Sequence, residues 1–359
     1  MKIRSVAWFT CIMLLLMSFM AACSSGNTSQ SGPSASVTDT SGSSSESPAG
    51  TDSGAGKRTV YPLTIENYTV SGESLEAEPK QQVFDKAPER VVANTQAVAE
   101  LLIKLGLVDK LVGVAALYGD PDPEVPAEEF AKVPVLSEGY VSKEIVVGAN
   151  PDLVMGRAGL FADADWGVGT VEGLNELGIR TYIHNTSLPG ATLDSLYRDI
   201  TEIGQIFDIQ EKAEEYLEKL QHRVASLKEK YGNESTLKFA IVNDIGDGNI
   251  SVDSGTYDSF QHDVLALIQL KNAFQGIEGW EASIEQLVAE KPDVLLLSYY
   301  KGAPDPQSTI DAIYANPALQ EIPAVQNKRI YVIDFNAFWG YGDQIIGAVE
   351  KLAQEIYGY

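Results

Sequence analysis

Positive charge is scarce in this chain of 359 residues, where 26 Lys and Arg stand against 50 Asp and Glu and give a net charge of -24. A nucleic-acid partner is not expected, because phosphate binding needs clustered Lys and Arg. Three His and two Cys exclude a His-rich or Cys-rich metal trap. Hydrophobic residues make up 44% of the chain, which is typical of a folded protein, and the length allows two domains with cores of their own.

Long apolar runs are also scarce, and the one that stands out is residues 6–20. It is shorter than the roughly 20 residues that a membrane-spanning helix needs, and Lys2 and Arg4 precede it, as in a secretory signal. The small residues directly before Cys23 resemble the lipobox of bacterial lipoproteins, with Met20 where Leu is usual. This resemblance implies that residues 1–22 are a signal peptide and that Cys23 carries lipid. The alternative is an uncleaved anchor with an incidental Cys.

Residues 23–56 contain little that could order them. Of the 33 residues after Cys23 in this segment, 22 are Ser, Thr or Gly, and none is Lys or Arg. Such a composition buries too little apolar surface to fold, so the segment is predicted to be a disordered tether. A lipid followed by a tether predicts a protein held at the outer face of the cell membrane.

The rest of the chain alternates short apolar strands with helices of 3.6-residue periodicity. Strands are predicted at 91–93, 111–114, 152–155, 181–184, 239–242, 293–297 and 330–333. The predicted helices between and after these strands include 259–270 and 344–357. This alternation predicts mostly parallel sheets covered by helices. We therefore expect an α/β fold with an N-terminal lobe at 57–191, a bridging helical segment at 192–232 and a C-terminal lobe at 233–359. The second helix of the bridge, about 20 residues long, is the long connection, and a ligand cleft is expected between the lobes.

An internal repeat supports two lobes of one design. Glu144 is followed after six residues by Pro151 and Asp152, and Glu285 is followed after six residues by Pro292 and Asp293. In both places a Pro-Asp pair ends a helix and leads into a buried strand. The repeat therefore predicts that Glu144 and Glu285 occupy equivalent positions in the two lobes.

These features together resemble the helical-backbone substrate-binding proteins of ABC importers, which carry iron–siderophore complexes, haem or corrinoids. The matching stretches are residues 88–92, 99–114, 150–154, 177–179, 285–293 and 322–332. The resemblance implies a monomeric receptor, not an enzyme, without a cofactor of its own, whose partners are a metal-chelate ligand and a permease dimer with its ATPase. It also implies that Glu144 and Glu285 pair with Arg residues of the permease. Read without the resemblance, each is an acid that favours a helix start.

Ligand contacts are expected where strand ends face the cleft, because crevices at the carboxyl ends of α/β strands are the usual sites. Aromatic side chains there can stack on a flat chelate at a low entropy cost. The candidates are Tyr118, Tyr140, Arg157, Phe161, Trp166 and His184 in the first lobe, and Tyr257, Trp280, Tyr299 with its neighbours Tyr300 and Lys301, Phe338 and Trp339 in the second. The alternative is that many of these side chains only pack loops against the lobes.

The scarcity of cations also bears on the ligand. Arg157 could bind an oxyanion of a chelate by two hydrogen bonds, or it could form an ordinary surface ion pair. A triply anionic catecholate complex would need several Arg or Lys, so a ferric hydroxamate or a corrinoid is favoured, with haem as a weaker alternative. His184 is a candidate axial ligand for haem or a packed polar residue. The other classes left open are a ligand sensor and a surface hydrolase, although no catalytic motif of a known class is present.

Overall fold

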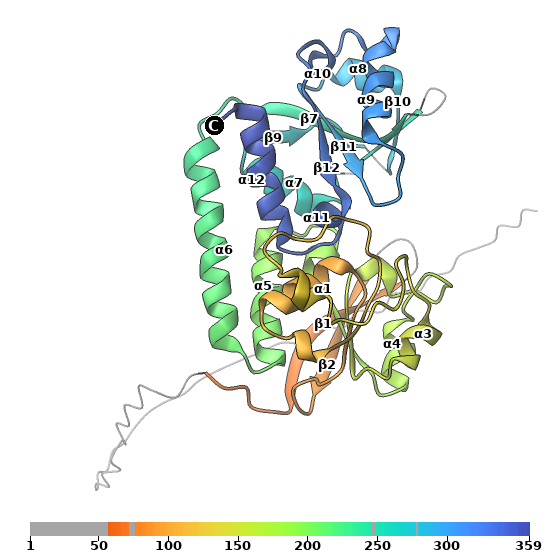
Figure 1. Cartoon of the computed structure of the whole chain (residues 1–359), viewed down its shortest axis with the longest axis vertical. Helices are drawn as coiled ribbons and strands as arrows, with labels where there is room; N and C mark the ends of the chain where they lie inside the picture. The colour runs from red at the N-terminus through yellow and green to blue at the C-terminus, as the bar shows by residue number, and fades with distance from the viewer. Residues whose placement is uncertain (1–56, 72–75, 246–248, 254, 278) are drawn as a thin grey trace, which may run out of the picture. The chain divides into compact units, whose positions relative to one another are not determined.

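The structure is a computed structural model that describes residues 57–71, 76–245, 249–253, 255–277 and 279–359. Two sheets form the cores of two α/β lobes, and the helices α5 (Leu193–Ile206) and α6 (Gln210–Tyr231) connect them in sequence (Figure 1). The predicted fold class is confirmed. The lobe boundaries stay predictions, and the signal peptide, Cys23 and the tether lie outside the described residues.

The sheet of the first lobe is fully parallel, with the strand order β4-β3-β5-β6. Its strands are β3 (Val91–Ala93), β4 (Leu111–Val114), β5 (Leu153–Gly156) and β6 (Arg180–Ile183). The helices α1 (Gln96–Lys104), α2 (Ala127–Phe130), α3 (Lys143–Gly148) and α4 (Val171–Glu176), with the 3-10 turns η1 (Val108–Lys110), η2 (Ala158–Leu160) and η3 (Asn185–Ser187), supply the connections. β3 and β5 are buried along their whole length, as strands covered on both faces must be.

An N-terminal hairpin closes one edge of this sheet. β1 (Leu63–Ser71) and β2 (Glu76–Phe84) pair antiparallel. The buried Asn67 side chain donates to the carbonyl of Ile183 at 2.9 Å and accepts from its N–H at 2.8 Å. The amide of Asn67 thus satisfies the backbone at the end of β6, where a further strand would otherwise pair.

The second sheet has a parallel centre and an antiparallel extension. Its parallel strands are β7 (Leu237–Ile245), β9 (Leu270–Asn272), β11 (Val294–Tyr299) and β12 (Ile330–Asp334), and the antiparallel ones are β8 (Asn249–Val252) and β10 (Glu281–Ser283). The helices are α7 (Ser259–Ala266), α8 (Ile284–Glu290), α9 (Pro306–Ala315), α10 (Pro323–Gln326), α11 (Phe335–Trp339) and α12 (Gln344–Tyr357), with the turn η4 (Pro317–Leu319). The predicted helix at 259–270 is too long, because Gln269 has a φ of 59° and turns the chain into β9.

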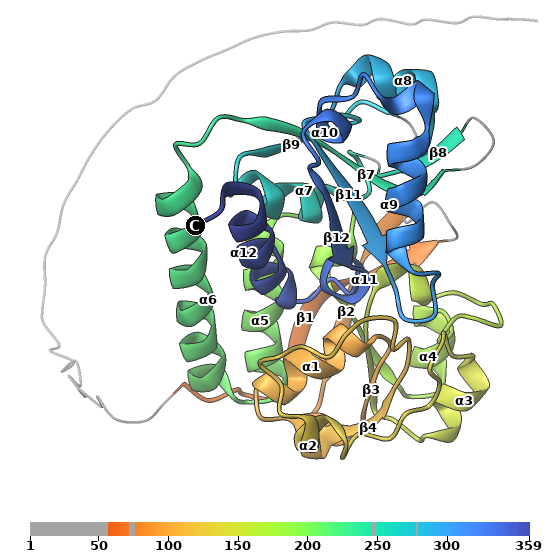
Figure 2. The same cartoon turned by 45° about the horizontal axis from the view of Figure 1, so that its top comes forward.

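The bridging segment packs as a layer rather than as a free rod. α6 has 22 residues, which makes it about 33 Å long. It runs beside α5 and α12 in both views (Figures 1 and 2), and one face, from Ala213 to Tyr231, is buried in the main core. Because α12 belongs to the C-terminal part of the chain, the two lobes share one continuous core on this side.

The internal repeat is a real structural repeat. After α3 and after α8, a residue with a left-handed backbone, Asn150 (φ 52°) and Lys291 (φ 51°), precedes the Pro-Asp pair. Asp152 then accepts the backbone N–H of Arg90 at 2.9 Å, and Asp293 accepts that of Lys238 at 2.8 Å. Each Asp therefore ties the start of its own strand to the start of a neighbouring strand, β3 or β7.

Candidate functional site

A cavity of about 340 Å³ lies between the two lobes. Arg157 reaches it from the end of β5, Ser298 and Tyr300 from the end of β11, and Phe335 from the end of β12. The remaining lining residues are Asp253, Tyr257, Asp258, Trp280, Trp339 and Tyr341. The carboxyl ends of parallel strands from both lobes thus meet here, as they do at ligand crevices of α/β folds.

Two stacked aromatic pairs form walls of this interlobe cavity. The ring centroids of Tyr257 and Trp280 are 4.8 Å apart, and those of Phe335 and Trp339 are 5.3 Å apart. Trp280 is 47% exposed and Tyr300 is 45% exposed, so part of each ring is open to solvent. The walls offer flat, partly open surface of the kind that stacks on a planar or apolar ligand.

A second aromatic group connects the first lobe to this wall. The ring of Tyr118 contacts Tyr140 at 5.1 Å, Phe335 at 6.0 Å and Tyr300 at 6.3 Å between centroids. Burial among these rings raises the pKa of Tyr118 above its usual value. Tyr118 and Tyr140 therefore lie at the edge of the interlobe cavity, although they are not among its lining residues.

Charge in the cavity is mixed. The Arg157 guanidinium lies over the ring of Tyr341, 5.4 Å from its centroid. The side chain of the buried Asn94 fixes the Arg157 backbone, because Asn94 accepts from its N–H at 2.9 Å and donates to its carbonyl at 3.1 Å. Asp258 accepts a hydrogen bond from the Trp339 indole N–H at 3.2 Å. The described lining residues thus include one guanidinium, that of Arg157, and two carboxyl groups, those of Asp253 and Asp258.

A larger cavity of about 560 Å³ lies on the α6 side of the lobe junction. Six carboxylates line it, together with Arg223 and Lys351, and no aromatic side chain does so among the described residues. Such walls offer no surface for stacking. We therefore take the smaller, aromatic cavity as the candidate ligand site.

A family model for periplasmic binding proteins matches residues 91–337, which is more than half of the chain. The chain belongs to the periplasmic binding protein family. This family consists of transport proteins that bind substrates, not of enzymes.

Two relatives add to this assignment. An uncharacterized ABC transporter substrate-binding lipoprotein of Bacillus subtilis, YvrC, is 26% identical over 315 residues, covering 85% of this chain and 89% of its own. The vitamin B12-binding protein of Yersinia pestis is 24% identical over 215 residues, covering 59% and 70% of the two chains. Both relatives are named as binding proteins, in agreement with the family match.

Solved structures agree with the fold. A periplasmic binding protein from Veillonella parvula superimposes with a TM-score of 0.72 at 24% identity and covers 82% of this chain and 98% of its own. A protein of an ABC-type Fe3+-hydroxamate transport system from Saccharomonospora viridis gives a TM-score of 0.65 at 25% identity, with coverage of 84% and 100%. In the described part of this binding protein, no helix is long and apolar enough to cross a membrane.

The predicted ligand residues divide into two groups. Arg157, Tyr257, Trp280 and Trp339 line the interlobe cavity, as does Tyr300, while Tyr118 and Tyr140 lie at its edge. Phe161 and Phe338 are buried in core clusters instead. Trp166 is 43% exposed but does not line the cavity.

Two further predicted residues lie away from the cavity for clear reasons. Side chains alternate along a strand, so Tyr299 of β11 points away from the face on which Ser298 and Tyr300 line the cavity. His184 is 1% exposed, packs edge-on against Tyr182 with centroids 5.8 Å apart, and burial lowers its pKa. His184 is thus a packing residue, and Tyr299 lies outside the cavity lining.

Five lining residues were not predicted: Asp253, Asp258, Ser298, Phe335 and Tyr341. Phe335 directly follows a strand that the sequence predicts, so the rule of strand ends was enough to find it. Asp258 is the N-cap residue of the predicted helix α7, which is also a readable signal. Asp253 follows β8, a strand that the sequence did not predict.

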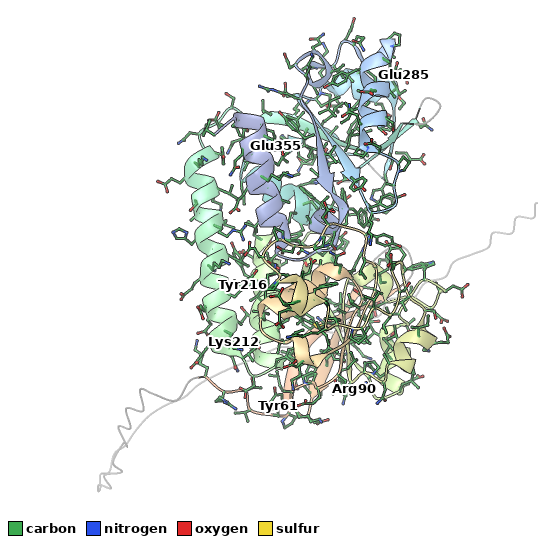
Figure 3. The ribbon with its side chains drawn as sticks, in the orientation of Figure 1. Tyr61, Arg90, Lys212, Tyr216, Glu285 and Glu355 are labelled. Atoms are coloured by element: carbon green, nitrogen blue, oxygen red, sulfur yellow. The ribbon has the colours of Figure 1, made fainter. Side chains whose placement is uncertain are left out.

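Glu144 and Glu285 occupy matching sites on the surface. Each lies two residues after a Ser at the N-cap of a short helix, α3 or α8, and both are exposed. Hydrogen bonds from its own backbone N–H and from that Ser hold the pKa of each carboxyl below its usual value. Figure 3 shows Glu285 at the outer end of the second lobe. Both carboxylates are therefore ionised at neutral pH and available to a partner.

Proposed function

We propose that this binding protein is a membrane-anchored receptor that delivers a near-neutral metal chelate, with a ferric hydroxamate favoured, to an ABC importer. The observation that carries the proposal is the interlobe cavity with two stacked aromatic pairs and a single guanidinium among its described lining residues. Aromatic walls suit a chelate with an apolar outer surface, and one Arg does not balance a trianion. The similarity to a protein of an Fe3+-hydroxamate transport system supports the same class.

A corrinoid is the second candidate. The relative from Yersinia pestis binds vitamin B12, and a corrin ring is a flat, large surface for the pairs Tyr257–Trp280 and Phe335–Trp339. Haem is less favoured, because its propionates need cations and because His184 is buried away from the cavity. Calorimetric titration of the protein with a ferric hydroxamate, a ferric catecholate, cobalamin and haem distinguishes these classes. If none of the four chelates binds saturably with one-to-one stoichiometry, the proposal is contradicted.

For delivery, we propose that the loaded receptor docks on the permease dimer through Glu144 and Glu285, one acid from each lobe. Matched charges across an interface set its register and its rate of association. The equivalent positions in the structural repeat fit a partner built from two like subunits. The lipid on Cys23 and the tether would keep the receptor at the outer face of the membrane, as a monomer.

Charge reversal tests the docking role. Glu144→Lys with Glu285→Lys is expected to abolish chelate uptake by cells and to leave calorimetric affinity unchanged, because neither residue lines the cavity. The matched control is Glu218→Lys with Glu229→Lys on α6, which makes the same charge change at exposed helical sites on the other side of the fold (Figure 1). Equal uptake by the two double variants, or lost affinity in the first, contradicts docking through these acids.

A further inference from the structure

Two buried acids line the interlobe cavity, and the proposed function gives them no role in ligand recognition. Asp253 is 3% exposed and Asp258 is 4% exposed, and both line the cavity. Asp258 also holds Trp339 through the indole N–H, and Trp339 in turn stacks on Phe335. The carboxylates therefore lie next to the aromatic wall that a bound chelate would cover.

Buried carboxylates discriminate among ligands by charge and by hydrogen-bond type. An ionised carboxylate accepts hydrogen bonds only, so it binds N–H donors and repels another carboxylate. Screening by water is weak at a buried site, which makes the preference stronger than on an open surface. Aromatic rings around a carboxylate add attraction for cations through their faces.

Arg157 does not reverse this preference. Its guanidinium stacks on Tyr341, and it is the single cation among the described lining residues. Counted at their ordinary charges, the two carboxylates and one guanidinium among the described lining residues give a net charge of -1. A ligand group that enters beside Asp253 and Asp258 therefore meets a surface that favours donors.

We infer that Asp253 and Asp258 are specificity residues that select chelates by their outer groups. The site accepts chelates that present N–H donors there, as an ammonium group or as primary amides, and rejects chelates that present a free carboxylate. This inference rests on the proposed function and refines it. An ammonium group would come from a linear hydroxamate siderophore, and primary amides would come from the rim of a corrinoid.

The test uses the full chain in detergent and two matched ligand pairs in calorimetry. The first pair is a ferric trihydroxamate with a free terminal ammonium and the same chelate with that amine succinylated to a carboxylate. The second pair is cobalamin and its monocarboxylic acid, in which one primary amide is hydrolysed. Within whichever pair binds, the N–H form is expected to bind at least tenfold more tightly. The pair that binds identifies the source of the donors.

Substitution of each acid tests whether Asp253 and Asp258 cause the preference for the N–H form of the ligand. Asp253→Asn and Asp258→Asn each remove a charge and keep the shape, so each is expected to reduce the preference at least threefold. Asp311→Asn, at an exposed site of α9, is the matched control and is expected to keep it. If Asp258→Asn fails to fold because the exchange disturbs the hydrogen bond from Trp339, Asp253→Asn and the unmodified protein still decide the question.

The outcomes separate this inference from the proposed function. Equal affinity within the binding pair, tighter binding of the carboxylate form, or a preference that survives both Asn variants overturns the inference and leaves the receptor assignment intact. Binding of catecholate or haem in place of either pair overturns the inference as well. Failure of all chelates to bind contradicts the proposed function itself.

Discussion

At the scale of single residues, burial shifts the pKa of Glu100 strongly. Glu100 is fully buried, and it accepts hydrogen bonds from Asn336 at 3.2 Å and Gln344 at 3.1 Å, which belong to the C-terminal part of the chain. Burial raises the pKa of Glu100 from 4.5 to about 7, although the Gln96 amide, the backbone N–H of Asp122 and the charge of Lys104 favour its ionised form. The ionisation of this residue is therefore coupled to folding.

The raised pKa predicts a pH dependence with a definite sign. The protonated form contributes full stability below pH 4.5, and that contribution is lost as the pH rises to about 7. The shift corresponds to about 3 kcal/mol. We expect the difference in unfolding free energy between the native chain and Glu100→Gln to fall by about this amount between pH 4.5 and pH 8, as measured by urea titration.

The comparison with Glu100→Gln is needed because His262 has the opposite effect. Burial lowers its pKa to about 4, so acidification below 6.5 destabilises the fold through this residue. Both proteins contain His262, and its contribution cancels in the difference. A difference that does not change with pH contradicts the account of Glu100.

At the scale of elements, the contact between α1 and the loop before α12 joins the two lobes. Lys104 of α1 pairs with Asp122 at 2.7 Å and with Asp343, and Tyr216 of α6 donates to Asp343. The side chains of Lys104, Asp122 and Asp343 are at most 5% exposed. Figure 3 shows Tyr216 along α6 at the level of this junction.

Removal of the cation at this junction is expected to be costly. Lys104→Met keeps the length of the side chain and leaves Asp122 and Asp343 buried without their counterion. Breaking a buried pair in this way destabilises a protein by about 3–5 kcal/mol. Urea unfolding measures the effect, with Lys351→Met, whose side chain is 80% exposed, as the control. A loss of less than 1 kcal/mol in Lys104→Met is incompatible with a network that joins the lobes.

The elements that the sequence predicted are those with strong local signals. α12 has the predicted bounds of 344–357, because its apolar residues repeat at helical spacing over four turns. The short strands β8, β9 and β10 were not predicted, since polar residues interrupt their sequences, whereas the equally short β3 is wholly apolar. Asp253 was not predicted for the same reason, because it follows one of these strands.

At the scale of the whole molecule, the repeat of Glu, six residues and Pro-Asp was enough to predict two lobes of one design. The Asp of each Pro-Asp pair accepts a backbone N–H at the start of a neighbouring strand, so the repeated sequence corresponds to a repeated structure. The cavity between the lobes depends instead on how side chains from distant segments point. Tyr300 and Tyr299 are neighbours in sequence, yet only Tyr300 lines it, and strand register rather than composition decides between them.

The central claim, that a chelate binds between the lobes, is tested most directly by tryptophan fluorescence. We expect a chelate of one class to quench the full chain saturably at one-to-one stoichiometry and sub-micromolar concentration, because Trp280 and Trp339 line the cavity. Trp280→Ala is expected to weaken that binding about tenfold, as for an aromatic residue in a binding wall. Trp166→Ala, a similarly exposed Trp outside the cavity, is expected to leave it unchanged. Equal affinities of the two variants, or quenching that never saturates after correction for ligand absorbance, would contradict the account.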